Sequence, residues 1–550
     1  MRIFLLTLVL ACATTWAQDT PPVEANSAST VTVEGTVTNQ ATGEPVRGAE
    51  VLLIRDEPAA VDGQNRLIGA RTDAAGHFSI SAAEPGRYRL RASHNRYLAG
   101  MFGARSPDSP GAVLTLTAGQ HVSSANISLL PSAVIQGRVV DENGDPMLGV
   151  EMSALKYARR GPVRMLLPHG RAQTDDRGEY RIFGLAPGNY YLQAVHRRVD
   201  WFGAKKNDNL TYLPTYYPGV SELSEATPIE AQAGGEIPVD FTLTRSPTVR
   251  ITGSIVNPGS DETEGYNVVL IAPGVGPVGA NINQDRSKFE IQGVAPGNYI
   301  LEAQSYGPRN VARGAREAIT VGSAPLDGIK LALSPPIQIR GTIRVDRNAS
   351  INLSQLSLSL SEANPSDPQM MWGGRGNDAV TRDGNFELHD ITPGEYRLEV
   401  SARGGGLEDW YTKAVHFGPR DVTDSLLKVT GGGAMPLDVV ISPAGATIQG
   451  IVKDANDHPV PAATVVTVPQ GKHQDRIDLY QTAVTDQQGF FKIRGAAPGE
   501  YKVFAWEDVE NDAWFDADFM KNYESQGTSL SVSEWERSTL SLRVIPSSKK

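Results

Sequence analysis

The nine histidines are the first residues to consider for chemistry, because His combined with acidic neighbours could bind zinc. A zinc peptidase site needs His-x-x-Glu and a distant third His, and no His in this chain has Glu three residues later. His-Glu-x-x-His and the Gly-x-Ser-x-Gly elbow of serine hydrolases are also missing from the sequence. The sequence therefore predicts a protein that is not an enzyme, with no metal site, no cofactor and no catalytic residues.

One glycine motif superficially resembles a dinucleotide site. Gly274, Gly276 and Gly279 have the Gly-x-Gly-x-x-Gly spacing and follow an apolar segment. Pro277 interrupts the motif and no helical pattern follows, so a loop between two strands is the better interpretation.

Two acidic clusters could supply oxygen ligands for calcium. One contains Asp141, Glu142 and Asp145, and a denser one contains Asp508, Glu510, Asp512, Asp516 and Asp518. Neither has the spacing of an EF-hand loop. Turn-forming Asp residues would explain the first cluster and a solvated insertion the second, so calcium binding stays open as an alternative.

Aromatic residues outside the repeated core are the most suggestive surface feature, because flat rings stack on sugar faces. The candidate carbohydrate-binding residues are Trp201, Tyr212, Tyr216, Tyr217, Trp372, Trp410, Tyr411, Trp506 and Trp514. Rings in long insertions also cover the ends of domains, so local packing is the alternative. Exposed, coplanar rings would favour binding.

A Pro-Gly-x-Tyr tetrapeptide recurs five times, with intervals of 102, 109, 97 and 105 residues. A period near one hundred residues matches an independently folding β-sandwich and is too long for a solenoid repeat. The repeated Pro, Gly and Tyr residues are Pro85, Gly86 and Tyr88; Pro187, Gly188 and Tyr190; Pro296, Gly297 and Tyr299; Pro393, Gly394 and Tyr396; and Pro498, Gly499 and Tyr501. The pair suits the centre of a type II turn.

Each copy also opens with an apolar-x-Gly-x-apolar strand. The glycines are Gly35, Gly137, Gly253, Gly341 and Gly450. A glycine between two core residues weakens a strand, so a bulky neighbour should fill the gap, and the Tyr after Pro-Gly is the candidate. A Thr-Asp-x-x-Gly-x-aromatic segment, as at Thr72 to Phe78, predicts a hairpin loop.

These patterns predict an all-β chain of five tandem immunoglobulin-like or prealbumin-like Greek-key sandwiches in an extended array. The expected ranges are 31–131, 132–247, 248–336, 337–444 and 445–546, with the third and fourth copies divergent, a flexible segment at 18–30 and a tail at 547–550. The linkers between copies are short, so five sandwiches end to end would form a rod of roughly 200 Å.

The first 17 residues place Arg2 before an apolar run and a small-residue exit, which predicts a secretory signal peptide. Cys12 is the only cysteine, so lipidation there is an alternative and disulfides are not expected. No later apolar run is long enough to span a membrane, and the formal charge of −11 argues against a nucleic-acid partner. We expect an exported protein, whether periplasmic, outer-membrane-associated or extracellular.

The combined pattern resembles the carboxypeptidase regulatory-like domain family. Residues 33–92, 134–194 and 448–505 carry the resemblance best. It implies transthyretin-like or collagen-adhesin B-type sandwiches that serve as non-catalytic parts of secreted bacterial proteins. The leading interpretation is thus a binding or structural protein whose partner is carbohydrate or another surface. The alternative is an accessory scaffold that docks an envelope protein such as a transporter or peptidase.

Overall fold

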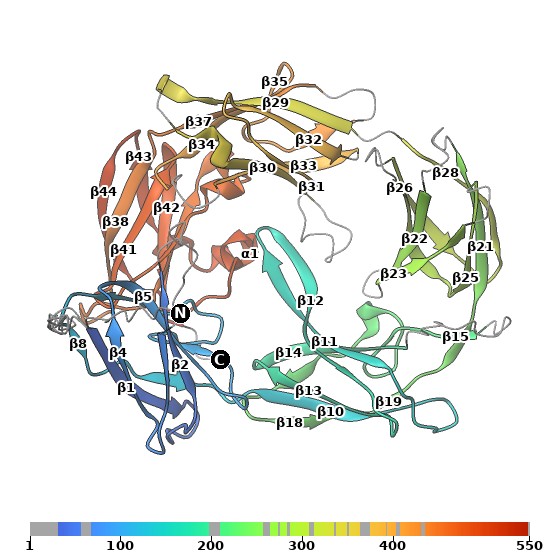
Figure 1. Ribbon diagram of the computed structural model, residues 1–550, viewed down its shortest axis with the longest axis horizontal. Helices are drawn as coiled ribbons and strands as arrows, with labels where there is room; N and C mark the ends of the chain where they lie inside the picture. The colour runs from blue at the N-terminus through green and yellow to red at the C-terminus, as the bar shows by residue number, and fades with distance from the viewer. Residues whose placement is uncertain are drawn as a thin grey trace, which may run out of the picture.

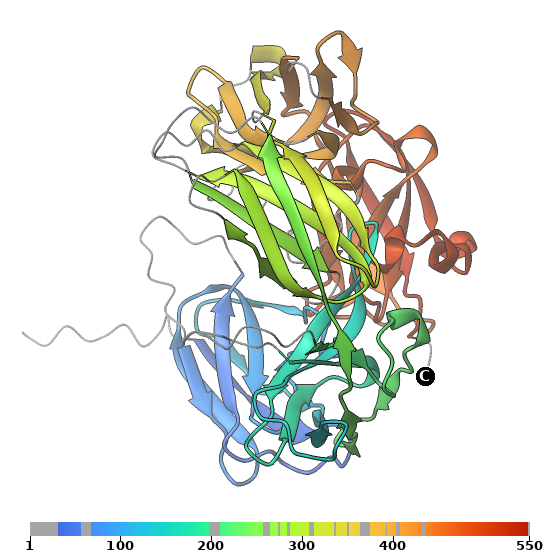
Figure 2. The same ribbon diagram turned by 90° about the vertical axis from the view of Figure 1, so that its right-hand side faces the viewer.

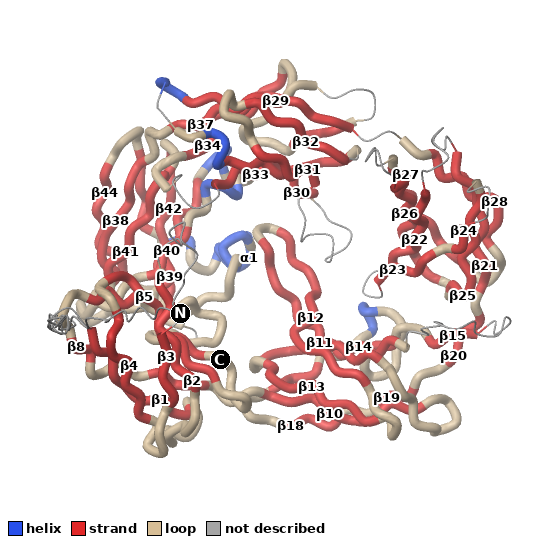
Figure 3. The backbone as a smooth tube through the Cα atoms, in the orientation of Figure 1, coloured by secondary structure: helices blue, strands red, loops and turns tan. Residues whose placement is uncertain are grey.

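The computed structural model describes residues 31–56, 68–196, 210–256, 265–272, 276–282, 287–306, 313–334, 337–348, 351–363, 375–391, 393–402, 408–430 and 435–547. The predicted leader with Cys12, the 18–30 segment, and the candidate residues Trp201 and Trp372 lie outside these ranges. Strands dominate the described chain, as Figure 3 shows, and the all-β prediction is confirmed.

Five large clusters of buried apolar side chains lie one in each of the five expected ranges, and we call the corresponding units sandwich 1 to sandwich 5. Each unit consists of two sheets packed face to face. In each, the first strand pairs in parallel with a strand from the end of the same unit.

Sandwiches 1 and 2 have the same layout, with additional short strands at their edges. Sandwich 1 consists of β1 (Val31–Asn39), β4 (His77–Ala83), β8 (His121–Val122) and β9 (Ile127–Leu129) in one sheet, and β2 (Glu50–Arg55), β3 (Ile68–Arg71), β5 (Gly86–Ser93), β6 (Gly100–Met101) and β7 (Val113–Leu116) in the other. Sandwich 2 consists of β10 (Ala133–Val140), β13 (Glu179–Leu185), β18 (Glu236–Pro238) and β19 (Phe241–Thr242) in one sheet, and β11 (Glu151–Arg160), β12 (Val163–Gln173), β14 (Gly188–Val195), β16 (Thr215–Tyr216) and β17 (Ile229–Ala231) in the other. A separate ribbon pairs β15 (Leu210–Tyr212) with β20 (Arg245–Pro247).

The other three sandwiches repeat this arrangement. Sandwich 3 consists of β21 (Val249–Val256), β24 (Asn281–Ile282), β25 (Lys288–Val294) and β28 (Leu326–Ala332), facing β22 (Gly265–Ala272), β23 (Gly276–Gly279), β26 (Gly297–Tyr306) and β27 (Gly314–Val321). Sandwich 4 consists of β29 (Ile337–Val345), β32 (Asn385–Ile391), β34 (Tyr411–Phe417), β35 (Arg420–Asp421) and β37 (Leu437–Ser442), facing β30 (Leu356–Glu362), β31 (Arg375–Ala379), β33 (Gly394–Ala402) and β36 (Leu427–Val429). Sandwich 5 consists of β38 (Ala446–Lys453), β41 (Phe490–Ala496) and β44 (Arg537–Arg543), facing β39 (Thr464–Pro469), β40 (Thr482–Val484), β42 (Gly499–Trp506) and β43 (Thr528–Val532).

Helices are short throughout the described residues. They are α1 (Ala517–Lys521) and the 3-10 helices η1 (Leu223–Glu225), η2 (Asp346–Asn348), η3 (Leu353–Gln355), η5 (Gly471–His473), η6 (Ile477–Leu479), η7 (Ala513–Phe515) and η8 (Glu524–Gln526). Among the described residues, no helix has the length and apolar character needed to cross a membrane.

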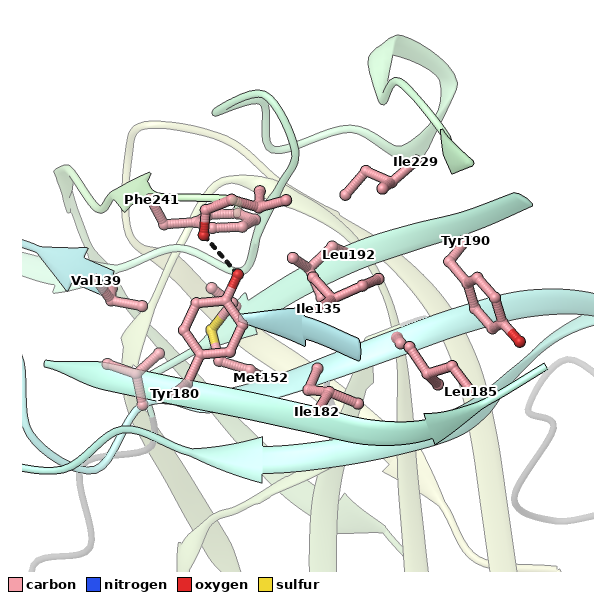
Figure 4. Close-up of a cluster of buried hydrophobic side chains, with 14 of the residues drawn as sticks. Ile135, Val139, Met152, Tyr180, Ile182, Leu185, Tyr190, Leu192, Ile229 and Phe241 are labelled. Carbon is pink, nitrogen blue, oxygen red and sulfur yellow. Dashed lines mark hydrogen bonds between the residues drawn. The ribbon is translucent and has the colours of Figure 1, made fainter. Parts of the chain in front are cut away.

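The glycine in each first strand is required because the backbone near the end of the same unit lies directly against it. A Cβ added to Gly137 would lie 1.8 Å from the carbonyl oxygen of Val239. That same carbonyl accepts a 2.6 Å hydrogen bond from the hydroxyl of Tyr180 within the sandwich 2 core (Figure 4). Tyr180 is the aromatic residue of the Thr-Asp-x-x-Gly-x-aromatic segment. The prediction that the Tyr after Pro-Gly fills this gap is wrong, because a backbone carbonyl and the aromatic residue of the Thr-Asp-x-x-Gly-x-aromatic segment occupy the space.

The Pro-Gly-x-Tyr segment has a different role from the one predicted. The glycines Gly86, Gly188, Gly297 and Gly499 have φ angles of 157°, 142°, 159° and 157°, far from the value of about +80° in a type II turn. They begin strands rather than turns. The Tyr hydroxyl folds back to donate a hydrogen bond to the carbonyl four residues earlier, as from Tyr190 to Ala186 at 2.8 Å. A side chain on the glycine would crowd this ring at two copies, since a Cβ would lie 3.3 Å from Tyr299 at Gly297 and 3.2 Å from Tyr396 at Gly394.

The prediction that the Thr-Asp-x-x-Gly-x-aromatic segment forms a hairpin is wrong, because the strands on its two sides, such as β40 and β41, lie in opposite sheets; the segment is a tight turn that connects the two sheets. In sandwich 5, Asp486 Oδ1 accepts hydrogen bonds from the backbone N–H groups of Gln488 and Phe490, each at 2.9 Å. Gly489 supplies the positive φ of 73°. The same contacts recur around Asp73 and Asp175. Local side-chain bonds therefore fix these loops.

The threonine of this segment stabilises a neighbouring turn. The buried Thr485 hydroxyl accepts a 2.8 Å hydrogen bond from the N–H of Ala463 and donates a 2.7 Å bond to the carbonyl of Val460. We expect Thr485→Val to lower the stability of sandwich 5 by about 2–3 kcal/mol, because both backbone groups would be buried without partners. Thr485→Ser keeps the hydroxyl and should cost about 1 kcal/mol for the lost methyl. If calorimetry showed the same loss of stability for Thr485→Val and Thr485→Ser, this role of the hydroxyl would be contradicted.

The five sandwiches close into a ring rather than an extended array (Figure 1). Sandwich 5 lies beside sandwich 1, and the β11–β12 hairpin of sandwich 2 reaches α1 (Figure 1). Seen from its right-hand side, the molecule presents the strands of sandwich 3, with sandwiches 1 and 2 below and sandwich 4 above (Figure 2). The expected extended array and rod are therefore wrong, because contacts between distant parts of the chain hold its two halves together.

Candidate functional site

The dense acidic cluster of sandwich 5 forms the contact that closes the ring. Glu507 forms an ion pair with Arg105 at 2.6 Å, and Asp508 accepts a 2.7 Å hydrogen bond from the Ser106 hydroxyl, both in sandwich 1. These acidic side chains face sandwich 1 instead of lying in a solvated loop.

The same acidic segment also holds the hairpin of sandwich 2. Asp512 accepts a 2.8 Å hydrogen bond from the N–H of Gly161, and Asp516 pairs with Arg159. Burial raises the pKa of Asp516, but hydrogen bonds from the N–H groups of Phe519 and Asp518 and the charge of Arg159 outweigh it and lower that pKa. Among the described residues, no group of three or more acidic, His or Cys side chains is placed to hold a metal ion. The calcium alternative thus gains no support from this cluster.

The predicted carbohydrate-binding aromatics that fall within the described residues do not form one exposed platform. Trp506 and Trp514 are 2% and 6% exposed, and both pack in a second apolar cluster of sandwich 5. Trp410 packs against the core of sandwich 4, and Tyr411 packs against the core of sandwich 5. The faces of the two buried tryptophan rings are covered by protein, so packing accounts for their positions.

The tyrosines of sandwich 2 are likewise engaged inside the protein. Tyr216 is buried, and its hydroxyl accepts a 2.8 Å hydrogen bond from the amide of Gln193. Tyr212 and Tyr217 are partly buried against the sandwich 2 core, with the guanidinium of Arg245 5.9 Å from the centre of the Tyr212 ring.

Within the described part of the chain, sequence reasoning missed one exposed tryptophan. Trp535 is 58% exposed and lies in the tight loop between β43 and β44. Its φ of 63° is a conformation that non-glycine residues rarely adopt, and it costs about 1–3 kcal/mol. Its N–H donates a 3.0 Å hydrogen bond to the carbonyl of Ala444, which holds the loop in place. The signal in the sequence was a Trp between two charged residues, Glu534 and Glu536, in a turn.

A groove begins at Trp535, at the junction of sandwiches 4 and 5. Its volume is about 270 Å³. Its lining side chains are mostly polar and come from both sandwiches: Asp409, Thr447, Gln449, Lys492, Arg494, Trp535 and Arg537. The floor is the outer face of the sheet formed by β41, β38 and β44, on the outside of the ring (Figure 1). A flat ring beside fixed polar groups is an arrangement that can bind a sugar.

One of the cationic side chains at the groove, Arg494, is held by carboxylates of sandwich 4. Arg494 pairs with Asp409 and with Glu408, the latter at 2.5 Å, and the hydrogen bond to Asp409 raises the pKa of Arg494. Lys492 and Arg537 have no ion-pair partner among the described residues. The groove therefore presents positive charge to solvent.

A larger cavity, of about 610 Å³, lies between sandwiches 3 and 4. The ion pair of Arg316 with Glu362, at 3.6 Å, crosses this junction. Tyr396 contributes to the lining of this cavity but is only 1% exposed. The cavity accordingly lacks the exposed ring that the Trp535 groove has.

Comparison with known proteins agrees with the fold. The carboxypeptidase regulatory-like domain family matches residues 32–130 and 447–510. Colossin-A of Dictyostelium discoideum is 23% identical over 450 residues, which cover 73% of this chain and 4% of that protein. The chain thus spans a very small part of the curated relative it matches.

Solved structures with similar sandwiches include pilins. A streptococcal ancillary pilin has 14% identity and a TM-score of 0.21, covering 56% of this chain and 99% of its own. GBS52, a minor pilin of Streptococcus agalactiae, has 15% identity and a TM-score of 0.21, covering 40% of this chain and 97% of its own. These overlaps say nothing about the ring or its role.

The fold and the groove together define a tandem β-sandwich protein, a class that fits a non-catalytic structural or binding role. Within that class, sandwich 1 and sandwich 5 are the two units that match the carboxypeptidase regulatory-like domain family.

Proposed function

We propose that this chain is a non-catalytic binding protein that binds carbohydrate through the outer face of sandwich 5. The observation that carries the proposal is Trp535, an exposed ring held by a strained loop over a groove of polar side chains. Proteins keep such strain mainly where the position serves a function. The predicted leader at residues 1–17 supports the further proposal that the protein is exported.

Sandwich 4 supports this role by holding the loop of Trp535 in one position. Tyr411 of sandwich 4 donates a 3.3 Å hydrogen bond to Glu534, the residue before Trp535. Glu534 also pairs with Lys413 at 3.3 Å and with Arg347. Contacts from sandwich 4 thus fix the loop before any ligand arrives, which lowers the entropic cost of binding.

Trp535→Ala is expected to weaken binding to a retained polysaccharide by at least about tenfold, because a stacked ring contributes about 1.5 kcal/mol. The measurement is retardation in affinity gels across a polysaccharide panel, followed by titration of Trp fluorescence. Phe183→Ala is the matched control, since Phe183 is an exposed aromatic, at 68%, in sandwich 2. Equal binding by Trp535→Ala and wild type would overturn the proposed site.

A second candidate function is docking of an envelope protein partner. Phe183 favours it, because this exposed ring lies on β13, an edge strand of its sheet, and edge strands can pair with a partner's strand. If no polysaccharide in the panel binds the protein, docking of a partner becomes the leading candidate function.

A further inference from the structure

The outer face of sandwich 5 presents its side chains in ordered rows. Pairing sets Thr447 beside Arg494 on β41 and Arg537 on β44. Two residues further along β38, Gln449 lies between Lys492 and Thr539. The next row places Ile451 between Phe490 and Ser541, and a last pair joins Lys453 with Arg543. Successive rows are about 7 Å apart, so the face is about 20 Å long from Thr447 to Lys453.

This face has a consistent positive charge in a chain whose formal charge is −11. Its outward-facing charged residues are all cationic: Lys453, Lys492, Arg494, Arg537 and Arg543. Neighbouring carboxylates neutralise the two ends, since Arg494 pairs with Asp409 and Arg543 pairs with Asp457 at 2.8 Å. Arg537 in the first row and Lys492 in the second row have no ion pair among the described residues, so their charge is open to a ligand.

An aromatic side chain lies at each end of the rows of charged residues. Trp535 precedes Arg537 at one end, and Phe490, 39% exposed, pairs with exposed Ile451 at the other. A ligand that followed β38 would meet a ring, then cations, then a second apolar contact. An elongated polymer fits this order better than a single small sugar.

We propose that the ligand of this face is a polysaccharide bearing carboxylate groups, whose chain follows β38 from Trp535 towards Phe490. This inference rests on the proposed function and names its substrate class. Arg537 can bind a carboxylate through two parallel hydrogen bonds, and Lys492 supplies a second charge one row along. A nucleic acid is disfavoured, because its dense phosphates call for more cations than these two and for a less acidic protein.

The test compares polygalacturonate with its fully methyl-esterified form, which has the same sugar backbone without the charge. Alginate, hydroxyethylcellulose and single-stranded DNA complete the panel. We expect the full chain to bind polygalacturonate or alginate at least tenfold more tightly than the two neutral polymers, with affinity falling as salt rises. Lys492→Gln combined with Arg537→Gln should weaken this binding at least tenfold, whereas Arg47→Gln combined with Arg91→Gln in sandwich 1 should leave it unchanged.

The outcomes separate the two proposals. Equal binding of charged and neutral polymers, lost in Trp535→Ala, keeps the proposed function and overturns the carboxylate inference. DNA binding as tight as that of the acidic polysaccharides also overturns the inference, because the face would then bind any polyanion. No binding to any polysaccharide overturns both. Circular dichroism of the double variant checks that its fold is intact.

Discussion

Charge reversal of Arg105 and Arg159 is expected to open the ring and enlarge the protein in solution. Arg105→Glu would face Glu507, and Arg159→Glu would face Asp516, so two attractive contacts would become repulsive. Individual ion pairs of this kind contribute about 0–1 kcal/mol, so the closure depends on several of them acting together. Small-angle X-ray scattering measures the result directly.

The radius of gyration expected for a closed ring differs widely from that expected for a straight rod. Five sandwiches of about 13 Å radius of gyration in a closed ring give about 30 Å overall, whereas the same five in a straight rod give about 58 Å. We expect about 30 Å for the wild type and an increase of at least about 5 Å for the double reversal. Arg47→Glu with Arg91→Glu reverses two exposed charges of sandwich 1 that form no ion pair among the described residues, and it should leave the radius unchanged. An unchanged radius for the Arg105 and Arg159 variant would show that these pairs do not hold the ring closed.

Gly450→Ala is expected to destabilise sandwich 5 by about 3 kcal/mol or more. The added Cβ would lie 2.0 Å from the carbonyl oxygen and 2.8 Å from the carbonyl carbon of Leu540 in β44. Both atoms belong to backbone that pairs with β38, so the contact can be relieved only by moving β44 away. Because Trp535 lies in the loop that leads into β44, carbohydrate binding should weaken as well.

Gly322→Ala is the matched control for this substitution. A Cβ at Gly322 would have no atom within 4 Å and its φ lies outside the left-handed region, so we expect no loss of stability. Calorimetry of the full chain should show a shifted transition for Gly450→Ala only, with the other sandwiches unfolding as in the wild type, since a chain of several domains does not unfold in one step. Identical traces for the two variants would contradict the assigned contact.

The sequence alone determined the repeated architecture, because its signals are local. Asp486 and Gly489 fix a tight turn through bonds that span four residues, and the alternation of apolar residues on each side of Gly450 indicates a strand with one buried face. The period of the Pro-Gly-x-Tyr segment predicts five copies from the sequence alone. Even here the filler of the glycine gap was misassigned, since the carbonyl of Leu540 comes from 90 residues further along the chain.

The tertiary structure decided everything that depends on contacts between distant residues. Ser106 and Asp508 are 402 positions apart, and Arg159 and Asp516 are 357 apart, so no local pattern could show that an acidic segment closes a ring. The burial of the tryptophans also depends on contacts between distant residues. Trp514 and Trp535 both lie in polar segments of the sequence. An apolar cluster around Val466 and Ile545 buries Trp514, whereas a strained turn at the edge of a sheet exposes Trp535. Burial is a property of the packed chain, because it depends on which surfaces meet.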